Sequence, residues 1–206
     1  MPDLSSSDGI DPKIDSEYKL IGAIGSGDIP AFEKLIQRYR NSVLNFIYKY
    51  LGDRFGAEDL AQEVFLRVYS SAAEFEPRGK VSTWIFKIAY NLSVNEILRR
   101  KRLCLIADTV EGKGIELAAP NPVDELELKE ILMDAVARLP EKQKAALLLR
   151  VNEELSYSEI GNVLSVSVSS VESLLFRARE NLRKTLGENV EGKSGSRQNS
   201  DQFVGL

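Results

Sequence analysis

The segment that most constrains the fold is residues 155–179, LSYSEIGNVLSVSVSSVESLLFRAR. Ser156 and Glu159 have the spacing of a capping box, which begins a helix by satisfying two backbone N–H groups. Residues 165–167 interrupt the helical pattern, and apolar residues then return at the spacing of a second amphipathic helix. Two short helices joined by so tight a turn are typical of a helix-turn-helix.

Side-chain size predicts how this motif packs. Gly161 has no side chain, so we expect a second helix to cross closely there. Val166 is expected to fill the turn as its apolar plug. The second helix buries the apolar positions that recur every three or four residues: Val171, Leu174 or Leu175, Ala178 and Leu182.

The outward positions of the second helix are suited to contact with DNA. They are Ser169, Ser170, Ser173 and Arg177. Short hydroxyls let a helix sit deep in the major groove, and Arg177 can reach a phosphate or a guanine edge. Arg179 suits the phosphate backbone. An ordinary helical hairpin with a basic end has the same spacing, so both interpretations stay open on the residues alone.

Glu172 has two interpretations on this helix. Its carboxylate can accept a hydrogen bond from a cytosine amino group. It can also complete a second capping box begun by Ser169. We favour the capping role, because an acid that faces DNA repels phosphates.

A polar stripe marks a helix nearer the N-terminus. Asp59, Gln62, Glu63 and Arg67 recur at spacings of three and four, so they share one face. Leu60, Val64, Phe65 and Val68 form the opposing, apolar stripe. On physical grounds alone, such a polar stripe indicates a solvated face.

Positive charge gathers between Arg78 and Arg102, where seven lysines and arginines stand against one acid, Glu96. Trp84 and Tyr90 interleave with this charge, and Asn91 and Asn95 share a face with Lys87. Rings, amides and cations together suit unstacked bases of single-stranded nucleic acid. The alternative is that Trp84 is an ordinary core residue.

Composition excludes several classes of function. The chain has no histidine, one cysteine and a formal net charge of −4. We therefore expect no internal disulfide, no metal, no cofactor and no enzymatic activity. No apolar run approaches the roughly 18 residues of a membrane span, and the N-terminus lacks the order of a signal peptide. We expect a cytoplasmic protein without membrane insertion.

Helical periodicity, interrupted by glycines and prolines, predicts an all-α fold. We expect two small helical domains joined by a flexible linker, with the helix-turn-helix in the C-terminal domain. Glycines and prolines set the expected boundaries. These are a disordered tail at 1–16, a helical domain at 17–102, a linker at 103–123, a helix-turn-helix domain at 124–186 and a disordered tail at 187–206.

Four segments together resemble a known family. DLAQEVF (59–65) and STWIFKIAYNL (82–92), followed by an arginine-rich helix end, resemble conserved region two of bacterial sigma factors. LPEKQ (139–143) and residues 155–179 resemble region four. In this order and spacing, from roughly Glu17 to Leu186, the chain is similar to the two-domain extracytoplasmic-function sigma factors.

The resemblance implies three binding surfaces. The surface for RNA polymerase would comprise Asp59, Gln62, Glu63 and Phe65. The surface that binds and melts the downstream promoter element would comprise Phe75, Lys80, Trp84, Lys87, Asn91, Asn95, Arg99 and Arg100. Within it, the loop at 75–80 and Asn91 would take a flipped base. The helix for the upstream element would present Ser169, Ser170, Glu172, Ser173, Phe176, Arg177 and Arg179.

The implied partners are core RNA polymerase, promoter DNA as duplex and as melted non-template strand, and an anti-sigma factor. A linker of 21 residues reaches up to ~70 Å when extended. Promoter elements one and a half to two duplex turns apart are roughly 50–70 Å distant, so the linker can bridge them.

The chain departs from the family pattern at three positions. Many relatives have a basic residue in place of Glu172, an arginine in place of Leu174 and a glycine in place of Ser165. These departures weaken the expected phosphate contacts and leave the preferred upstream sequence open.

Two rival functions remain. A stand-alone helix-turn-helix regulator would need a dimer interface and an effector domain, and the N-terminal half lacks the βα alternation of a receiver. A helical enzyme would need a catalytic constellation, which this composition lacks.

Overall fold

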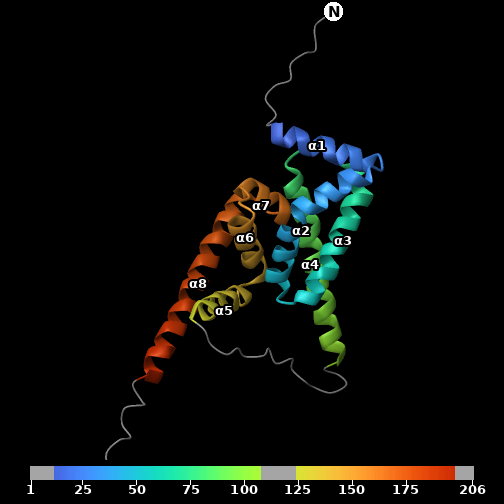
Figure 1. The fold of residues 1–206 in the computed structure, drawn as a ribbon. Helices are drawn as coiled ribbons and strands as arrows, with labels where there is room; N and C mark the ends of the chain where they lie inside the picture. The colour runs from blue at the N-terminus through green and yellow to red at the C-terminus, as the bar shows by residue number, and fades with distance from the viewer. Residues whose placement is uncertain (1–11, 108–123, 198–206) are drawn as a thin grey trace, which may run out of the picture. The chain divides into compact units, whose positions relative to one another are not determined.

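The structure is a computed structural model that describes residues 12–107 and 124–197. Every regular element among these residues is helical (Figure 1), which confirms the predicted all-α fold. The first helices in chain order are α1 (Pro12–Gly25), α2 (Ile29–Leu51), α3 (Arg54–Ser71), the short 3₁₀ helix η1 (Ala72–Glu74) and α4 (Val81–Ala107). The chain then continues with α5 (Asp124–Ala137), α6 (Glu141–Asn152), α7 (Tyr157–Leu164) and α8 (Val168–Arg197).

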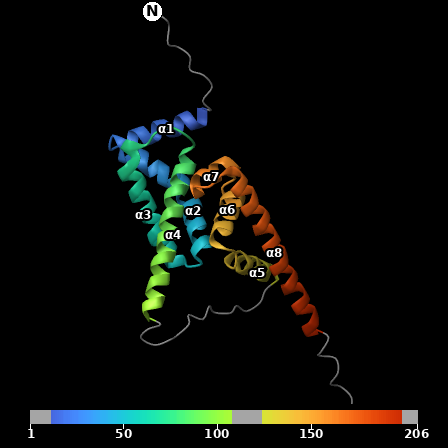
Figure 2. The ribbon, with the colours of Figure 1, turned by 180° about the vertical axis from the view of Figure 1, so that it is seen from behind.

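The chain falls into two compact units that divide within α4, between Glu96 and Ile97. In the first unit, α1 lies across the ends of α2 and α3 (Figures 1 and 2). The apolar faces of three helices meet in its core. Its fully buried side chains include Leu35, Val43, Phe46, Ile47, Val64, Val68, Ile85 and Ala89.

Aromatic side chains fix α4 against α2. The rings of Phe46 and Phe86 meet edge to face at 5.6 Å, and those of Tyr50 and Tyr90 at 6.0 Å. Tyr90 is only 8% exposed. The expectation that Tyr90 interleaves with the surface charge is therefore wrong, because its position on α4 turns it toward α2.

Local capping determines where α2 and α3 begin and end. The Asp28 carboxylate accepts a hydrogen bond from the Ala31 N–H at 3.0 Å, which begins α2. Gly52 ends it in the left-handed conformation, with φ 74°, where a side chain would be strained. Asp53 then accepts from the Phe55 N–H at 3.1 Å and begins α3. These caps make α2 and α3 a helical hairpin.

In the second unit α5, α6 and α7 all pack against α8 (Figure 2). The buried side chains lie at helical spacing, as the amphipathic pattern predicts. They include Leu149 of α6, Ile160 and Val163 of α7, and Val171, Leu175 and Ala178 of α8. Of the two leucines left open by the sequence, Leu175 is the core residue and Leu174 lies half-buried.

Three helices extend into segments expected to be irregular. Pro12 begins α1, since proline suits a first helical turn, and α4 continues to Ala107, past the expected boundary at Arg102. α8 continues through Gly187 to Arg197, since a helical glycine costs only about 1 kcal/mol and need not end a helix. The rest of those segments, 1–11, 108–123 and 198–206, lies outside the described residues.

Candidate functional site

A groove of about 540 Å³ runs between α2 and α3 of the first unit. Apolar side chains line most of it and charged or amide groups lie among them. The lining residues are Phe32, Ile36, Arg40, Leu44, Glu58, Ala61, Gln62, Phe65 and Leu66. Leu66 is 62% exposed, so it adds an accessible apolar side chain to the apolar wall of the groove. The groove is thus an apolar surface with a polar margin.

Of the four predicted polymerase-binding residues on α3, Gln62 and Phe65 line the groove, and Asp59 and Glu63 are not among its lining residues. Asp59 and Gln62 are exposed, and Glu63 is half-buried and accepts a hydrogen bond from Arg67 Nε at 2.8 Å. Phe65 is only 6% exposed and lines the groove mainly from within the core. The resemblance placed Phe65 on the docking surface, whereas helical periodicity placed it on the buried stripe. The structure agrees with the periodicity.

The contribution of α2 to the groove was missed in the sequence. Phe32, Ile36, Arg40 and Leu44 recur every four residues, which is the spacing of one helical face. That repeat was visible, but apolar residues at this spacing also indicate core packing. Only the pairing of α2 with α3 shows that they line an open groove.

An aromatic cluster supports the loop between η1 and α4. The rings of Phe75 and Trp84 lie 4.9 Å apart, and Tyr18 of α1 lies 5.9 Å from Phe75. The Tyr18 hydroxyl also donates to the Gly79 carbonyl at 3.1 Å. Trp84 and Phe75 are half-buried, so each keeps part of its ring accessible. Trp84 is therefore neither a plain core residue nor fully solvated.

The face of α4 beyond this cluster is polar and accessible. Lys87, Asn91 and Asn95 are spaced by four and all exposed, and none of their side chains bonds to another described residue. Arg99, also exposed, continues the same spacing, and the adjacent Arg100 is half-buried; each of the two forms an interaction. Lys80 is exposed at the start of the helix and also has a partner. Amide groups are thus available beside accessible aromatic rings.

The capping box that begins α7 is confirmed. The Glu159 N–H donates to Ser156 Oγ at 3.3 Å, and the Ser156 N–H donates to Glu159 Oε2 at 2.7 Å. A Cβ at Gly161 would lie 2.8 Å from the Val166 carbonyl oxygen and 3.8 Å from a methyl of Val171. The close approach expected at Gly161 therefore exists, but its tightest contact is the turn backbone. Ser165 forms that turn in the left-handed conformation, with φ 54°.

The predicted capping box between Ser169 and Glu172 is wrong. α8 begins two residues earlier than that box requires, and Ser167 Oγ accepts from the Ser170 N–H at 3.2 Å. Several serines lie close together here, so the sequence did not distinguish which one caps the helix. Glu172 is left as an exposed residue on the second turn.

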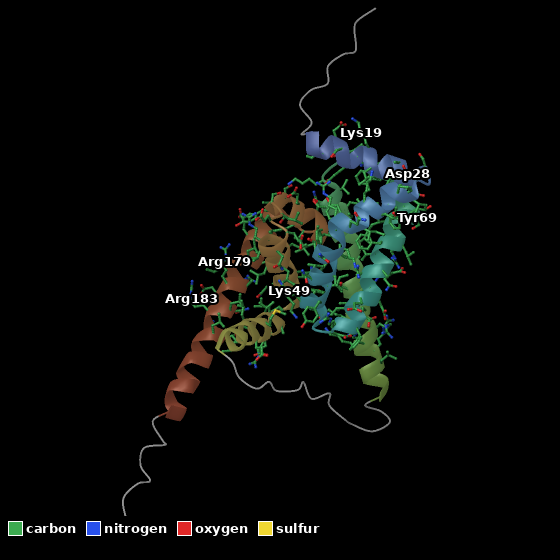
Figure 3. The ribbon with its side chains drawn as sticks, in the orientation of Figure 1. Lys19, Asp28, Lys49, Tyr69, Arg179 and Arg183 are labelled. Atoms are coloured by element: carbon green, nitrogen blue, oxygen red, sulfur yellow. The ribbon has the colours of Figure 1, made fainter. Side chains whose placement is uncertain are left out.

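All seven residues predicted for the upstream element are exposed on α8: Ser169, Ser170, Glu172, Ser173, Phe176, Arg177 and Arg179. Figure 3 shows Arg179, and Arg183 beyond it, projecting from the helix. Arg183 is paired with Glu180 on the same helix. Phe176 is 66% exposed, which is a large apolar surface for a solvated helix.

A shallow hollow of about 380 Å³ lies beside this face. Hydroxyls and cations dominate its lining, which comprises Lys142, Val166, Ser169, Ser170, Ser173, Leu174 and Arg177. Neither Lys142 nor Arg177 forms an ion pair with any residue in the described part of the chain. Lys142, which comes from α6, was missed in the sequence, where residues 139–143 served only as a motif of the family resemblance. The hollow offers two cations to an anion. Its three serine hydroxyls form hydrogen bonds at the start of α8, where Ser173 Oγ donates to the Ser169 carbonyl at 3.1 Å and Ser167 Oγ lies 3.1 Å from Ser169 Oγ and 2.8 Å from Ser170 Oγ.

Lys142 and Lys144 lie two residues apart on α6 but differ in how accessible their charge is to a ligand. Burial lowers the pKa of Lys144, although the nearby Glu141 carboxylate acts to raise it. Lys142 is exposed and lines the hollow. Of the two, Lys142 is the cation available to a ligand.

Within the described ranges, no three His, Cys, Asp or Glu side chains cluster as metal ligands. No described helix is both long enough and apolar enough to cross a membrane.

Comparison with known proteins gives two family matches. The model for sigma-70 region 2 matches residues 35–103. The model for sigma-70 region 4 matches residues 129–182. The first range contains all of the groove's lining residues except Phe32, together with the loop at 75–80 and Trp84. The second range contains the helix-turn-helix.

Relatives match along nearly their whole length. The ECF RNA polymerase sigma factor SigW of Bacillus subtilis is 32% identical over 178 residues, covering 82% of this chain and 95% of the relative. SigM of the same organism, also an ECF RNA polymerase sigma factor, is 31% identical over 158 residues, covering 77% and 96%.

Among solved structures, the sigma factor RpoE in complex with the anti-sigma factor NepR, from Bartonella quintana, has the same fold, with a TM-score of 0.65 at 23% identity over 76% of this chain and 96% of that one. The two ordered family matches and the near full-length relatives agree with the resemblance of the sequence motifs. This chain belongs to the family of ECF RNA polymerase sigma factors.

Proposed function

We propose that this sigma factor binds core RNA polymerase and directs it to promoters through two DNA elements, one opened and one duplex. The observation that carries the proposal is that one chain holds both the accessible set of Trp84, Lys87, Asn91 and Asn95 in the first unit and a helix-turn-helix in the second. A stand-alone regulator needs only the helix-turn-helix, and a surface suited to unstacked bases would have no purpose in it.

The groove between α2 and α3 is the proposed polymerase-binding surface. Its apolar walls and exposed Leu66 supply contact area, and Asp59, Gln62 and Glu63 supply polar contacts on the same helix. Protein interfaces combine an apolar centre with a polar rim in this way. Phe65 supports the groove wall from beneath, so it shapes the surface more than it contacts the partner.

The loop at 75–80 and the α4 face are the proposed site for the downstream element. Opening a duplex and flipping a base out of the stack costs a few kcal/mol, which new contacts must offset. The half-buried Phe75 and Trp84 rings provide stacking surfaces, and the exposed Asn91 amide can read a base edge. Lys80, Lys87, Asn95, Arg99 and Arg100 are proposed to hold the phosphates and edges along the strand.

The α8 face is the proposed site for the upstream duplex. Its serines let the helix approach the major groove, and Phe176, Arg177 and Arg179 contact bases and backbone. The hollow between Lys142 and Arg177 is suited to one backbone phosphate. Glu172, exposed and without a capping role, is available to a cytosine amino group.

The remaining parts of the proposal concern organisation and regulation. Residues 17–102 and 124–186 would act as two domains, with 103–123 as the tether between their DNA elements. RpoE of Bartonella quintana is bound by an anti-sigma factor, and we propose a partner of this class here. The protein would act in the cytoplasm, as an initiation factor and not as an enzyme.

Transcription in vitro from a promoter library, with core RNA polymerase and the purified protein, tests this function. We expect transcripts from a subset of promoters that share two sequence elements, and none when either component is omitted. If core polymerase and the protein together yield no promoter-specific transcripts, the proposal is contradicted.

A further inference from the structure

Helix α1 contacts the proposed base-capture loop, although it lies before the residues that match the family model for region 2. The loop itself has little support of its own. Residues 76–80 are all exposed, and the Glu76–Arg78 ion pair at 2.7 Å is local to the loop. Ordering such a segment costs conformational entropy, about 1–2 kcal/mol for each residue fixed. The contacts that order it therefore matter for any ligand it binds.

Tyr18 is the side chain of α1 that reaches this loop. Its hydroxyl donates to the Gly79 carbonyl at 3.1 Å, and its ring lies 5.9 Å from that of Phe75. Phe75 in turn contacts Trp84 at 4.9 Å. One side chain thus touches both ends of the loop, and through Phe75 it touches the proposed stacking surface.

The residue beside Tyr18 anchors α1 to the core. Glu17 is 6% exposed, and its Oε1 accepts a hydrogen bond from the Tyr39 hydroxyl at 2.7 Å. Arg38 pairs with the same oxygen at 3.1 Å. A buried carboxylate with two partners on α2 holds the helix in one position.

The far end of α1 is equally constrained. A Cβ at Gly25 would lie 2.9 Å from the Ala73 Cα, so α1 and η1 are in direct backbone contact. Because η1 leads directly into Phe75, α1 contacts this region at two places, through Tyr18 at the loop and through Gly25 at η1. These contacts fix where Tyr18 stands relative to Gly79.

We propose that Tyr18 is a positioning residue that holds the loop at 75–80 in the shape that accepts a flipped base. The proposal rests on the proposed function for that loop. Preorganising a loop removes an ordering cost that binding would otherwise have to meet. Tyr18 acts through Phe75 and Gly79 and need not touch the DNA, so it should affect strand capture and leave polymerase binding unchanged.

Two variants distinguish the contribution of the Tyr18 hydroxyl from that of its ring. Tyr18→Phe removes only the bond to Gly79, and Tyr18→Ala removes the ring contact as well. Lys19→Ala is the matched control, because Lys19 is exposed on the same helix and pairs only with Asp15 among the described residues (Figure 3). Circular dichroism establishes that each variant keeps its helical content.

The first measurement reports on the loop without DNA. Trp84 is the only tryptophan of the chain, so its fluorescence and its quenching by acrylamide report on this site alone. We expect a higher quenching constant for Tyr18→Ala, a smaller rise for Tyr18→Phe and no change for Lys19→Ala. Equal quenching in all proteins would overturn the proposal.

The second measurement uses holoenzyme on a promoter with 2-aminopurine at the candidate flipped position. We expect Tyr18→Phe to slow promoter opening by about 2- to 10-fold, the range for one hydrogen bond, with unchanged affinity for core polymerase. It should also reduce discrimination among bases at that position and leave discrimination at the upstream element intact. A parallel loss of core binding, or of discrimination at both elements, would make Tyr18 a general stabiliser and overturn the proposal.

The two proposals fail differently. If the wild-type protein opens no promoter with core polymerase, the proposed function fails, and the quenching measurement still tests the loop. If the wild type opens promoters while both Tyr18 variants match it, only the positioning role fails.

Discussion

At the scale of single residues, Phe65 and Leu66 show what periodicity can predict. They are adjacent on α3, yet Phe65 is 6% exposed and Leu66 is 62% exposed. The apolar stripe of the sequence predicts the first correctly, because helical spacing determines which residues face the core. Nothing in the local sequence indicates that the exposed Leu66 lines a groove. The groove exists only because α2 packs beside α3 and forms its other wall.

Alanine substitution at these two positions should have opposite consequences. Phe65→Ala leaves a cavity and should lower the stability of the first unit by about 3–5 kcal/mol. Leu66→Ala should change stability by less than about 0.5 kcal/mol, yet weaken core polymerase binding about tenfold, as for an interface hot spot. Thermal unfolding and a core-binding titration measure the two effects. If Leu66→Ala binds core polymerase as tightly as the wild type, the polymerase binds a surface other than this groove.

Asn91 gives a second test at this scale. Its exposed amide has no described partner, so Asn91→Ala should leave the fold unchanged. We expect promoter opening to slow about tenfold, as for one lost hydrogen bond, with little effect on core binding. Asn45→Ala, at an exposed position of α2, is the control and should open promoters normally. Equal loss of opening and core binding in Asn91→Ala would make Asn91 structural.

At the scale of elements, the helix-turn-helix was predictable and the groove was not. The capping box, the turn and the apolar spacing are all local, so the sequence of 155–179 contains them. The start of α8 was assigned two residues late, since Ser167 and Ser169 are equivalent by composition and only backbone geometry chooses between them. The groove between α2 and α3 depends on residues 14 to 34 positions apart in sequence, from Leu44 and Glu58 to Phe32 and Leu66, which no local pattern joins.

The turn of the motif should not accept a methyl group at Gly161. A Cβ there would lie 2.8 Å from a backbone oxygen, so Gly161→Ala should destabilise the second unit by about 1–3 kcal/mol. Gly187→Ala is the matched control. Its Cβ would meet no atom within 4 Å, so it should stabilise α8 by up to about 1 kcal/mol. Thermal unfolding that ranks the two variants the other way would contradict the packing described for the turn.

The hollow between α6 and α8 makes a prediction about salt. If Lys142 holds one phosphate, Lys142→Ala should lower the slope of log affinity against log salt by about 1 for holoenzyme on upstream duplex. The loss of affinity should be the same for all upstream sequences, since phosphates carry no base identity. Arg138→Ala, which removes a cation already paired with Asp134, is the control. A loss that depends on the base sequence would assign Lys142 to base reading.

At the scale of the whole molecule, the net charge bears on how tightly the protein can bind DNA without a partner. The net charge of −4 opposes tight binding to free DNA, although basic residues gather on α4 and α8. We therefore expect the protein to bind promoter DNA tightly only when a larger partner supplies much of the affinity. The glycines and prolines of the sequence predicted domain boundaries at 102/103 and 123/124, whereas the two compact units divide within α4, between Glu96 and Ile97. The bounds of α1, α4 and α8 also differ from those that glycine and proline positions predicted, because one such residue need not end a helix.

The most direct test of this account is the binding of a labelled promoter duplex, measured by fluorescence anisotropy with the protein alone and with core RNA polymerase. The account predicts weak, sequence-independent binding by the protein alone. It predicts tight binding that requires both promoter elements once core polymerase is present. Tight, sequence-specific binding of the duplex by the protein alone would contradict it and favour a stand-alone regulator.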